Sequence, residues 1–183
     1  MKQIVNLLFE SRILKDINRS GYAFLGTGRE SIAEHSFMTA LICFVMAKMD
    51  PELDMERMVT MSLVHDLAEA RTGDLNYVEK QYSRVDEEKA VSHLTRNVPF
   101  GRDIEALVDE FNDGTTREAQ LVNDADQLSF VLELKKQADI GAKGPDKWLA
   151  VVLNRLKTDM GRKIAKSIME TTWDEWWMND YSE

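Results

Sequence analysis

The chain has 183 residues, of which 44% are hydrophobic and 30% are charged. This is enough apolar material for one compact domain with a sizeable core, so we expect a single domain over residues 1–183. Lys and Arg total 23 against 32 Asp and Glu, which gives a formal net charge of −9. Because an acidic surface repels the phosphate backbone of nucleic acids, we expect no nucleic-acid polymer as a partner.

The cellular setting is predicted from cysteine use and from the apolar runs. Cys43 is the only cysteine, which excludes an internal disulfide and fits a reducing compartment. The longest apolar run, residues 41–47, is far shorter than the roughly 20 residues that span a bilayer. We therefore expect a cytoplasmic protein with no membrane partner.

The N-terminal half shows two clear helix starts after a first amphipathic segment. Ser31 and Glu34 form a capping box, which predicts a helix over residues 32–49 that ends at Asp50-Pro51. Asp54 is predicted to cap the next helix, which continues to just before Gly73. The glycine-rich residues 19–29 lie before the first of these helices and are predicted to form a loop, either plain turns or a surface that approaches a ligand.

The C-terminal half also has helical periodicity interrupted by glycine, asparagine and proline. We find no convincing strand, so the predicted fold class is all-α. Four further helices are predicted, over residues 85–96, 103–112, 116–140 and 147–171.

Several ionisable side chains fall on predicted apolar faces. His35 lies three residues after Ile32 and three before Met38, within an apolar stripe. In the next helix, Glu69 follows His65 by four residues and Asp66 by three, so these three side chains project to one side. On the helix at 116–140, Asp124 lies in the stripe of Leu121 and Leu128, whereas Asp126 points well around the helix.

A buried cluster of this kind needs a cation. Burying ionised carboxylates without a partner is prohibitive, and a divalent metal ion held by imidazoles and carboxylates removes that cost. Each residue taken alone has a simpler explanation, such as a core histidine bonded to a carbonyl or a surface pair. Their joint occurrence on three helices favours a metal site, and mixed nitrogen and oxygen ligands leave positions open for catalysis.

The order of these residues resembles a known signature. His35, then His65-Asp66, then Asp124 is similar to the H…HD…D pattern of the HD-domain metal-dependent phosphohydrolases, which are all-helical bundles. The surrounding segments ESIAEHSF, LVHDLAEARTGD and LVNDADQL resemble the 5′-deoxynucleotidase branch. The resemblance implies one divalent ion, with Mn, Co, Mg, Zn, Fe and Ni as candidates, and the ligands His35, His65, Asp66 and Asp124.

The same resemblance implies roles for residues beside the ion. Glu69 would handle the attacking water, and Asp74 would contact substrate and assist proton transfer. Arg19 would contact the nucleotide, and Tyr22 matches an aromatic position of some relatives and is expected to bind substrate. In other members a tryptophan directly follows the arginine and helps exclude the ribose 2′-hydroxyl. Here Ser20-Gly21 follows instead, which leaves sugar selectivity open.

The implied activity is hydrolysis of (deoxy)nucleoside 5′-monophosphates to nucleoside and phosphate. Two alternatives remain open at this point. The first is an HD-type phosphohydrolase acting on a cyclic diester, a nucleoside triphosphate or ppGpp, and the second is a non-catalytic nucleotide-binding module. The resemblance also implies a homodimer. The candidate contacts are the four tryptophans, which could instead pack within the domain: Trp148, Trp173, Trp176 and Trp177.

Overall fold

The structure is a computed structural model that describes residues 1–178, and within them it confirms the all-α prediction. The only β pairing there is an isolated bridge between Asn18 and Ser31. The helices are, in chain order, α1 (Lys2–Ser11), the 3-10 helix η1 (Arg12–Lys15), α2 (Tyr22–Leu25), α3 (Ile32–Met49), α4 (Met55–Val64), α5 (Glu69–Thr72), α6 (Glu79–Tyr82), α7 (Glu87–Thr95), α8 (Gly101–Asp113), α9 (Arg117–Asp139), α10 (Pro145–Leu153), α11 (Asp159–Glu170) and α12 (Glu175–Met178).

Helix α3 is central, and its start is set by the predicted capping box. The Ser31 side chain accepts from the Glu34 amide while the Glu34 side chain accepts from the Ser31 amide. The helix is long and apolar enough to cross a membrane by length and composition alone. Its buried residues instead pack against α4 and α9, where Cys43, Met46, Met58 and Leu128 form part of the main core.

The helix predicted to run from Asp54 to just before Gly73 is divided in two. Asp54 caps α4 as expected, but α4 ends at Val64, and a turn over residues 65–68 precedes the short α5. His65 and Asp66 therefore lie in a turn at the carboxyl end of α4. This turn lets both side chains reach the same space, which a continuous helix would restrict.

The predicted helix over residues 147–171 is also two helices. Helix α10 ends at Leu153 and α11 begins at Asp159 with Thr158 as its cap, its hydroxyl accepting from the Gly161 amide. A threonine followed by an aspartate is a helix-start signal that the longer apolar periodicity concealed. The break lies against α9, and this contact matters for the site.

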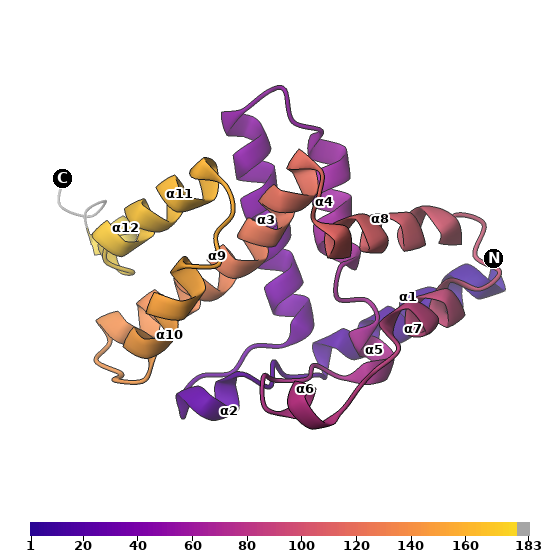
Figure 1. The fold of residues 1–183 in the computed structure, drawn as a ribbon, viewed down its shortest axis with the longest axis horizontal. Helices are drawn as coiled ribbons and strands as arrows, with labels where there is room; N and C mark the ends of the chain where they lie inside the picture. Colours follow the sequence, from indigo (N-terminus) through magenta and orange to yellow (C-terminus); the bar gives the residue numbers. More distant parts are fainter. Residues whose placement is uncertain (179–183) are drawn as a thin grey trace.

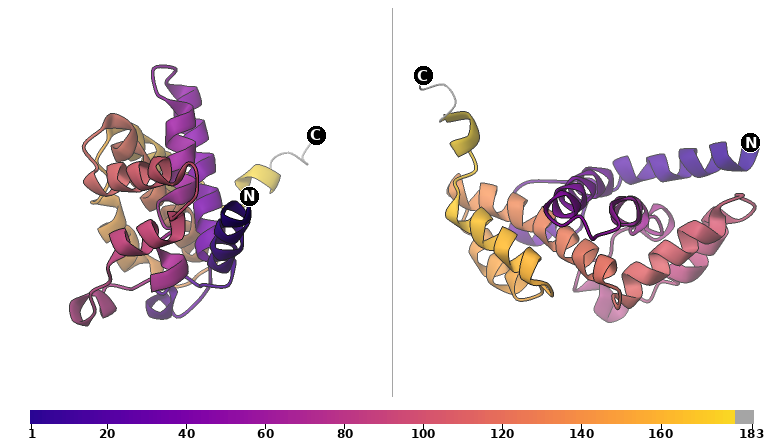
Figure 2. Two further views of the ribbon diagram at one scale, coloured as in Figure 1. Left: turned by 90° about the vertical axis from the view of Figure 1, so that its right-hand side faces the viewer. Right: turned by 90° about the horizontal axis from the view of Figure 1, so that it is seen from above.

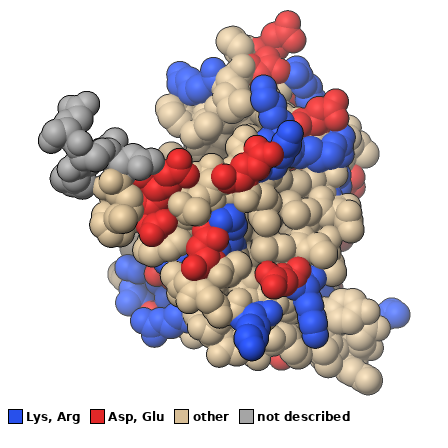
Figure 3. Space-filling view, turned by 90° about the vertical axis from the view of Figure 1, so that its left-hand side faces the viewer, with Lys and Arg blue, Asp and Glu red and all other residues tan. Residues whose placement is uncertain are grey.

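The helices form two groups around α3 and α9 (Figure 1). Helices α1, α7 and α8 extend toward the N-terminal end of the molecule, while α10, α11 and α12 lie at the opposite end (Figures 1 and 2). Over the face seen in Figure 3, Lys and Arg groups are interspersed with Asp and Glu groups. That face has no continuous basic band of the kind that binds nucleic-acid polymers.

Candidate metal centre and active site

Two histidines from different elements face each other in the interior. His35 of α3 is fully buried and His65 follows α4, and their ring centroids are 5.7 Å apart. His65 Nδ1 lies 2.8 Å from the carbonyl oxygen of Ser62. Since only a protonated Nδ1 can donate to a carbonyl, this contact assigns the tautomer and leaves the lone pair of Nε2 free to bind a metal.

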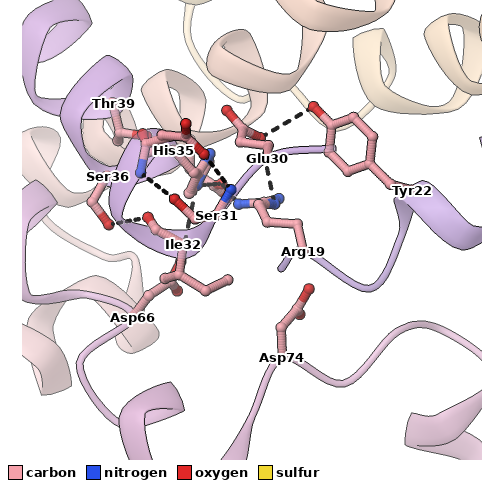
Figure 4. Close-up of polar contacts among 12 residues, drawn as sticks. Arg19, Tyr22, Glu30, Ser31, Ile32, His35, Ser36, Thr39, Asp66 and Asp74 are labelled. Carbon is pink, nitrogen blue, oxygen red and sulfur yellow. Dashed lines mark hydrogen bonds and ion pairs between the residues drawn. The ribbon is translucent and has the colours of Figure 1, made fainter. Parts of the chain in front are cut away.

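Two carboxylates approach the same nitrogens. Asp126 Oδ1 lies 2.9 Å from His35 Nε2, and Asp66 Oδ2 lies 3.2 Å from His65 Nε2 and 3.9 Å from His35 Nε2. One ligand atom each from His35, His65 and Asp126 fall within 4.8 Å of one another. The cluster joins α3, α9 and the turn after α4. Figure 1 shows helices α3, α4 and α9, and Figure 4 shows His35 and Asp66 of the cluster.

The donor set fits a divalent metal ion. Within residues 1–178, the buried Nε2 atoms of His35 and His65 and the Oε2 atom of Glu69 have no hydrogen-bond partner. Leaving such atoms unpaired costs about 1–3 kcal/mol each, so a ligand for them is expected. Imidazole nitrogen together with carboxylate oxygen suits first-row divalent ions, and His35, His65, Asp66 and Asp126 would hold the ion.

The structure corrects one predicted ligand. Asp124 is fully buried, but its carboxylate accepts from the Lys157 amide at 2.7 Å, the Thr158 amide at 2.8 Å and the Thr158 hydroxyl at 2.6 Å. A Cβ at Gly161 would collide with the same carboxylate. Asp124 therefore connects α9 to the start of α11 through these hydrogen bonds. The metal cluster contains Asp126 at the position that was predicted for Asp124.

The correction has a simple geometric cause. Positions 124 and 126 are two residues apart on a helix, which places their side chains about 200° apart around its axis. Helix α9 is buried on most sides, with Val122, Ala125 and Leu128 all fully covered. A helix surrounded in this way has no single apolar stripe, so the stripe of Leu121 and Leu128 did not identify the face toward the histidines.

The electrostatics of the cluster show how strongly it needs a cation. Burial, together with the nearby charges of Asp66 and Asp74, raises the pKa of Glu69 to about 9. Burial lowers the pKa of His65, but the charges of Asp66 and Asp126 raise it more, to about 9 overall. Without a cation, the negative charges of the nearby carboxylates favour protonation of Glu69 and His65. A bound cation favours the ionised carboxylates and the neutral imidazoles instead.

Two other predicted site residues, Asp74 and Arg19, lie near the cluster. Asp74 Oδ2 accepts from the Ser20 amide at 2.7 Å and from the Ser20 hydroxyl at 3.1 Å. This contact ties the loop that carries Arg19 to the segment after α5. Arg19 lies with Nη1 3.9 Å from Asp126 Oδ1, so its guanidinium borders the metal cluster (Figure 4).

Tyr22 has a different place from the one predicted. Its side chain is only 6% exposed, its ring packs in the core cluster with Leu134 and Leu149, and its hydroxyl lies 3.3 Å from Glu30 Oε2. A direct contact between Tyr22 and substrate is therefore not supported. Sequence reasoning also missed Glu30, although a glutamate directly before the capping box is a buried charge that needs a partner.

The comparisons with known proteins agree with this geometry. A family model described as HD domain matches residues 11–169. The chain belongs to the HD domain family. The resemblance to the HD-domain family inferred from the sequence is thereby confirmed, and with it the all-α fold.

Relatives of this HD domain carry a more specific name. The human protein "5′-deoxynucleotidase HDDC2" is 28% identical over 136 residues, covering 71% of this chain and 66% of the human protein. The Schizosaccharomyces pombe protein "5′-deoxynucleotidase hdd1" is 28% identical over 131 residues, covering 66% of this chain and 65% of that protein. The matched part thus spans just under two thirds of these relatives.

A solved structure shares the fold of this HD domain. The PH0347 protein from Pyrococcus horikoshii OT3 superposes with a TM-score of 0.76 at 28% identity, covering 91% of this chain and 98% of that chain. The arrangement of helices is therefore that of a known structure over nearly its whole length.

Metal binding should stabilise the HD domain measurably. A ligand present at about 100 times its Kd stabilises the folded state by about 2.7 kcal/mol if it does not bind the unfolded chain. For a chain of this size this corresponds to a rise in Tm of roughly 5–10 °C. Differential scanning calorimetry of chelator-treated protein with and without Mn²⁺ measures the shift. An equal shift in His35→Ala would show that the stabilising ion binds elsewhere.

Proposed function

We propose that this HD domain is a metal-dependent 5′-deoxynucleotidase, which hydrolyses (deoxy)nucleoside 5′-monophosphates to nucleoside and phosphate. The observation that carries the proposal is the convergence of His35, His65, Asp66 and Asp126 beside the half-buried Glu69 and the arginine at position 19. The names of the relatives supply the substrate class.

The divalent ion, when bound, would neutralise phosphate charge and make water more acidic, which are the two needs of a slow monoester hydrolysis. Glu69 is the group that would take the proton from the attacking water, since its buried Oε2 has no partner within the described residues. The water oxygen then forms a bond to phosphorus and the bond from phosphorus to the 5′ oxygen breaks. The proton that Glu69 took from the water is returned, with the assistance of Asp74, to that 5′ oxygen, so the nucleoside leaves as the alcohol.

Arg19 would bind the phosphate. Its guanidinium is 21% exposed at the side chain and, within the described residues, makes no direct side-chain hydrogen bond. A planar guanidinium can donate two parallel hydrogen bonds to a phosphate, which an ammonium cannot. The Asp74 carboxylate accepts hydrogen bonds from Ser20, the residue that follows Arg19. The same carboxylate would contact the substrate and assist proton transfer.

A phosphate-release assay tests this function. The purified protein is incubated with dAMP, dGMP, dCMP, dUMP and TMP under Mn²⁺, Co²⁺ or Mg²⁺, beside the matching ribonucleotides and an Asp126→Asn control. We expect release of phosphate from deoxynucleotides that the control lacks. Release of pyrophosphate from triphosphates or ppGpp, or opening of a cyclic diester, would assign the alternative phosphohydrolase. Tight binding of these compounds without turnover of any of them would indicate that the protein is a non-catalytic nucleotide-binding module.

The predictions of a homodimer and of a cytoplasmic location remain part of the proposal. Trp148 packs onto the core cluster of α2, α9 and α10, whereas Trp176 is 72% exposed on α12. Helix α3 exposes a second set of apolar side chains along one stripe, namely Phe37, Leu41, Phe44 and Val45. Analytical ultracentrifugation at micromolar concentration should show a dimer, and a monomer would contradict the prediction.

A further inference from the structure

Glu30 is a buried carboxylate that the mechanism above does not use. It is 6% exposed and immediately precedes the cap of α3. Its Oε2 accepts from the Tyr22 hydroxyl at 3.3 Å and lies 3.9 Å from Arg19 Nε (Figure 4). Burial raises the pKa of Glu30 to about 7, and the charge of Arg19 opposes this rise. The nearest cation to this costly buried group is therefore the proposed phosphate-binding residue.

Folding alone does not account for the Glu30 side chain. The start of α3 is already capped by Ser31 and Glu34, whose reciprocal hydrogen bonds involve no atom of the Glu30 side chain. The Glu30 carbonyl accepts from the Arg19 amide at 2.8 Å, a bond that any residue at position 30 would make. What is specific to glutamate here is the carboxylate, which faces the guanidinium.

The guanidinium of Arg19 lies between two carboxylates. Nε is 3.9 Å from Glu30 Oε2, Nη1 is 3.9 Å from Asp126 Oδ1, and the guanidinium carbon is 5.9 Å from the centroid of the Phe130 ring. Both ion-pair distances are too long for direct hydrogen bonds, so its N–H groups stay available for a ligand. If Glu30 lost its charge, attraction to Asp126 and Asp66 would no longer be opposed from that side and would draw the guanidinium toward the metal cluster.

We propose that Glu30, held by the hydroxyl of Tyr22, is a positioning residue that keeps Arg19 aimed at the phosphate of the substrate. The inference rests on the proposed function only in naming the ligand as a phosphate monoester. Glu30 acts through Arg19 and touches neither substrate nor metal. Tyr22 thus contributes to substrate binding indirectly, through its hydrogen bond to Glu30.

The experiment measures binding of inorganic phosphate to Mn²⁺-loaded protein by isothermal titration calorimetry, in Glu30→Gln, Arg19→Ala and the double variant. Glu133→Gln is the matched control, because Glu133 is a half-buried carboxylate near Glu30 with no ion pair to Arg19 within the described residues. We expect Glu30→Gln to weaken phosphate binding about tenfold, and Arg19→Ala to weaken it about 100-fold, in line with the loss of charge-assisted hydrogen bonds.

The double variant decides between positioning and a general structural effect. If Glu30 acts through Arg19, adding Glu30→Gln to Arg19→Ala costs less than about twofold more, because coupled residues are not additive. Full additivity, or unchanged phosphate binding in Glu30→Gln, would overturn the proposal. Mn²⁺ affinity should stay the same in Glu30→Gln, and its loss would overturn the proposal as well.

Two further measurements keep the outcome clear. Tyr22→Phe removes only the hydroxyl and should weaken phosphate binding about two- to fivefold, as expected for the loss of one neutral hydrogen bond. This variant tests the proposal if Glu30→Gln does not fold. Phosphate binding that is unaltered in Tyr22→Phe would contradict the role given to that hydroxyl. Because the titration uses phosphate and not turnover, its failure is distinct from a failure to hydrolyse deoxynucleotides.

Discussion

Asp126→Asn is expected to weaken Mn²⁺ binding at least about 100-fold and to abolish phosphate release, while Asp124→Asn retains both. Ligand loss should exceed the 10- to 100-fold effects known for residues that only support metal ligands. Asp126 Oδ1 lies within 2.9 Å of His35 Nε2, whereas both oxygens of Asp124 are occupied by the start of α11. Metal content of the purified variants and isothermal titration with Mn²⁺ measure the difference.

Asp124→Asn should instead lower stability. Charge-assisted hydrogen bonds contribute about 1.5–3 kcal/mol each, and asparagine would place an amide group against a backbone N–H. A net loss of about 3 kcal/mol would lower Tm by roughly 6–12 °C in a protein of this size. The opposite pattern, with metal lost in Asp124→Asn and kept in Asp126→Asn, would restore the ligand set predicted from the sequence and refute the one described above.

Glu69→Gln is expected to lower kcat for phosphate release by about 10²–10⁴-fold, the usual contribution of a positioned general base. KM and Mn²⁺ affinity should change little, because glutamine keeps the shape of the side chain. Burial of Glu69 beside Asp66 explains why this carboxylate is a stronger proton acceptor than an exposed one. Steady-state kinetics on the best deoxynucleotide of the panel give both constants.

The matched control for this variant is Glu56→Gln, which makes the same change on the exposed face of α4. It should leave kcat unchanged. A Glu69→Gln enzyme that keeps its wild-type kcat would remove Glu69 from proton transfer. A loss of Mn²⁺ together with kcat would assign Glu69 to metal binding instead.

Sequence patterns predicted the parts of the fold that depend on local signals. The capping box of Ser31 and Glu34 and the cap at Asp54 both have the predicted partners, and α3 has the predicted bounds. Local hydrogen bonds of this kind depend only on residues three positions apart. The two histidines were also predicted correctly as buried groups, because the sequence places apolar residues at helical spacing before each of them.

What the sequence did not predict depends on contacts across the molecule. The break between α10 and α11 forms where the amides of Lys157 and Thr158 meet Asp124, 33 and 34 residues away along the chain. The choice between Asp124 and Asp126 depends on which side of α9 faces α3. That orientation is set by packing on several sides at once, and periodicity in a single helix does not contain it.

The roles of Glu30 and Tyr22 were hidden for the same reason. In sequence they are a charge in a loop and an aromatic residue after two small ones. Only the approach of α2 to the segment before α3 shows that they form one unit with Arg19. A loop residue whose partner lies on a short helix elsewhere in the chain is not indicated by periodicity in the sequence.

One divalent ion is expected to bind between α3, α9 and the turn after α4, and diffraction from crystals grown with Mn²⁺ locates it. Anomalous diffraction at the manganese edge should place the ion about 2.0–2.3 Å from the Nε2 atoms of His35 and His65 and from oxygens of Asp66 and Asp126. A fully loaded protein whose manganese peak lies away from both histidines would contradict the account.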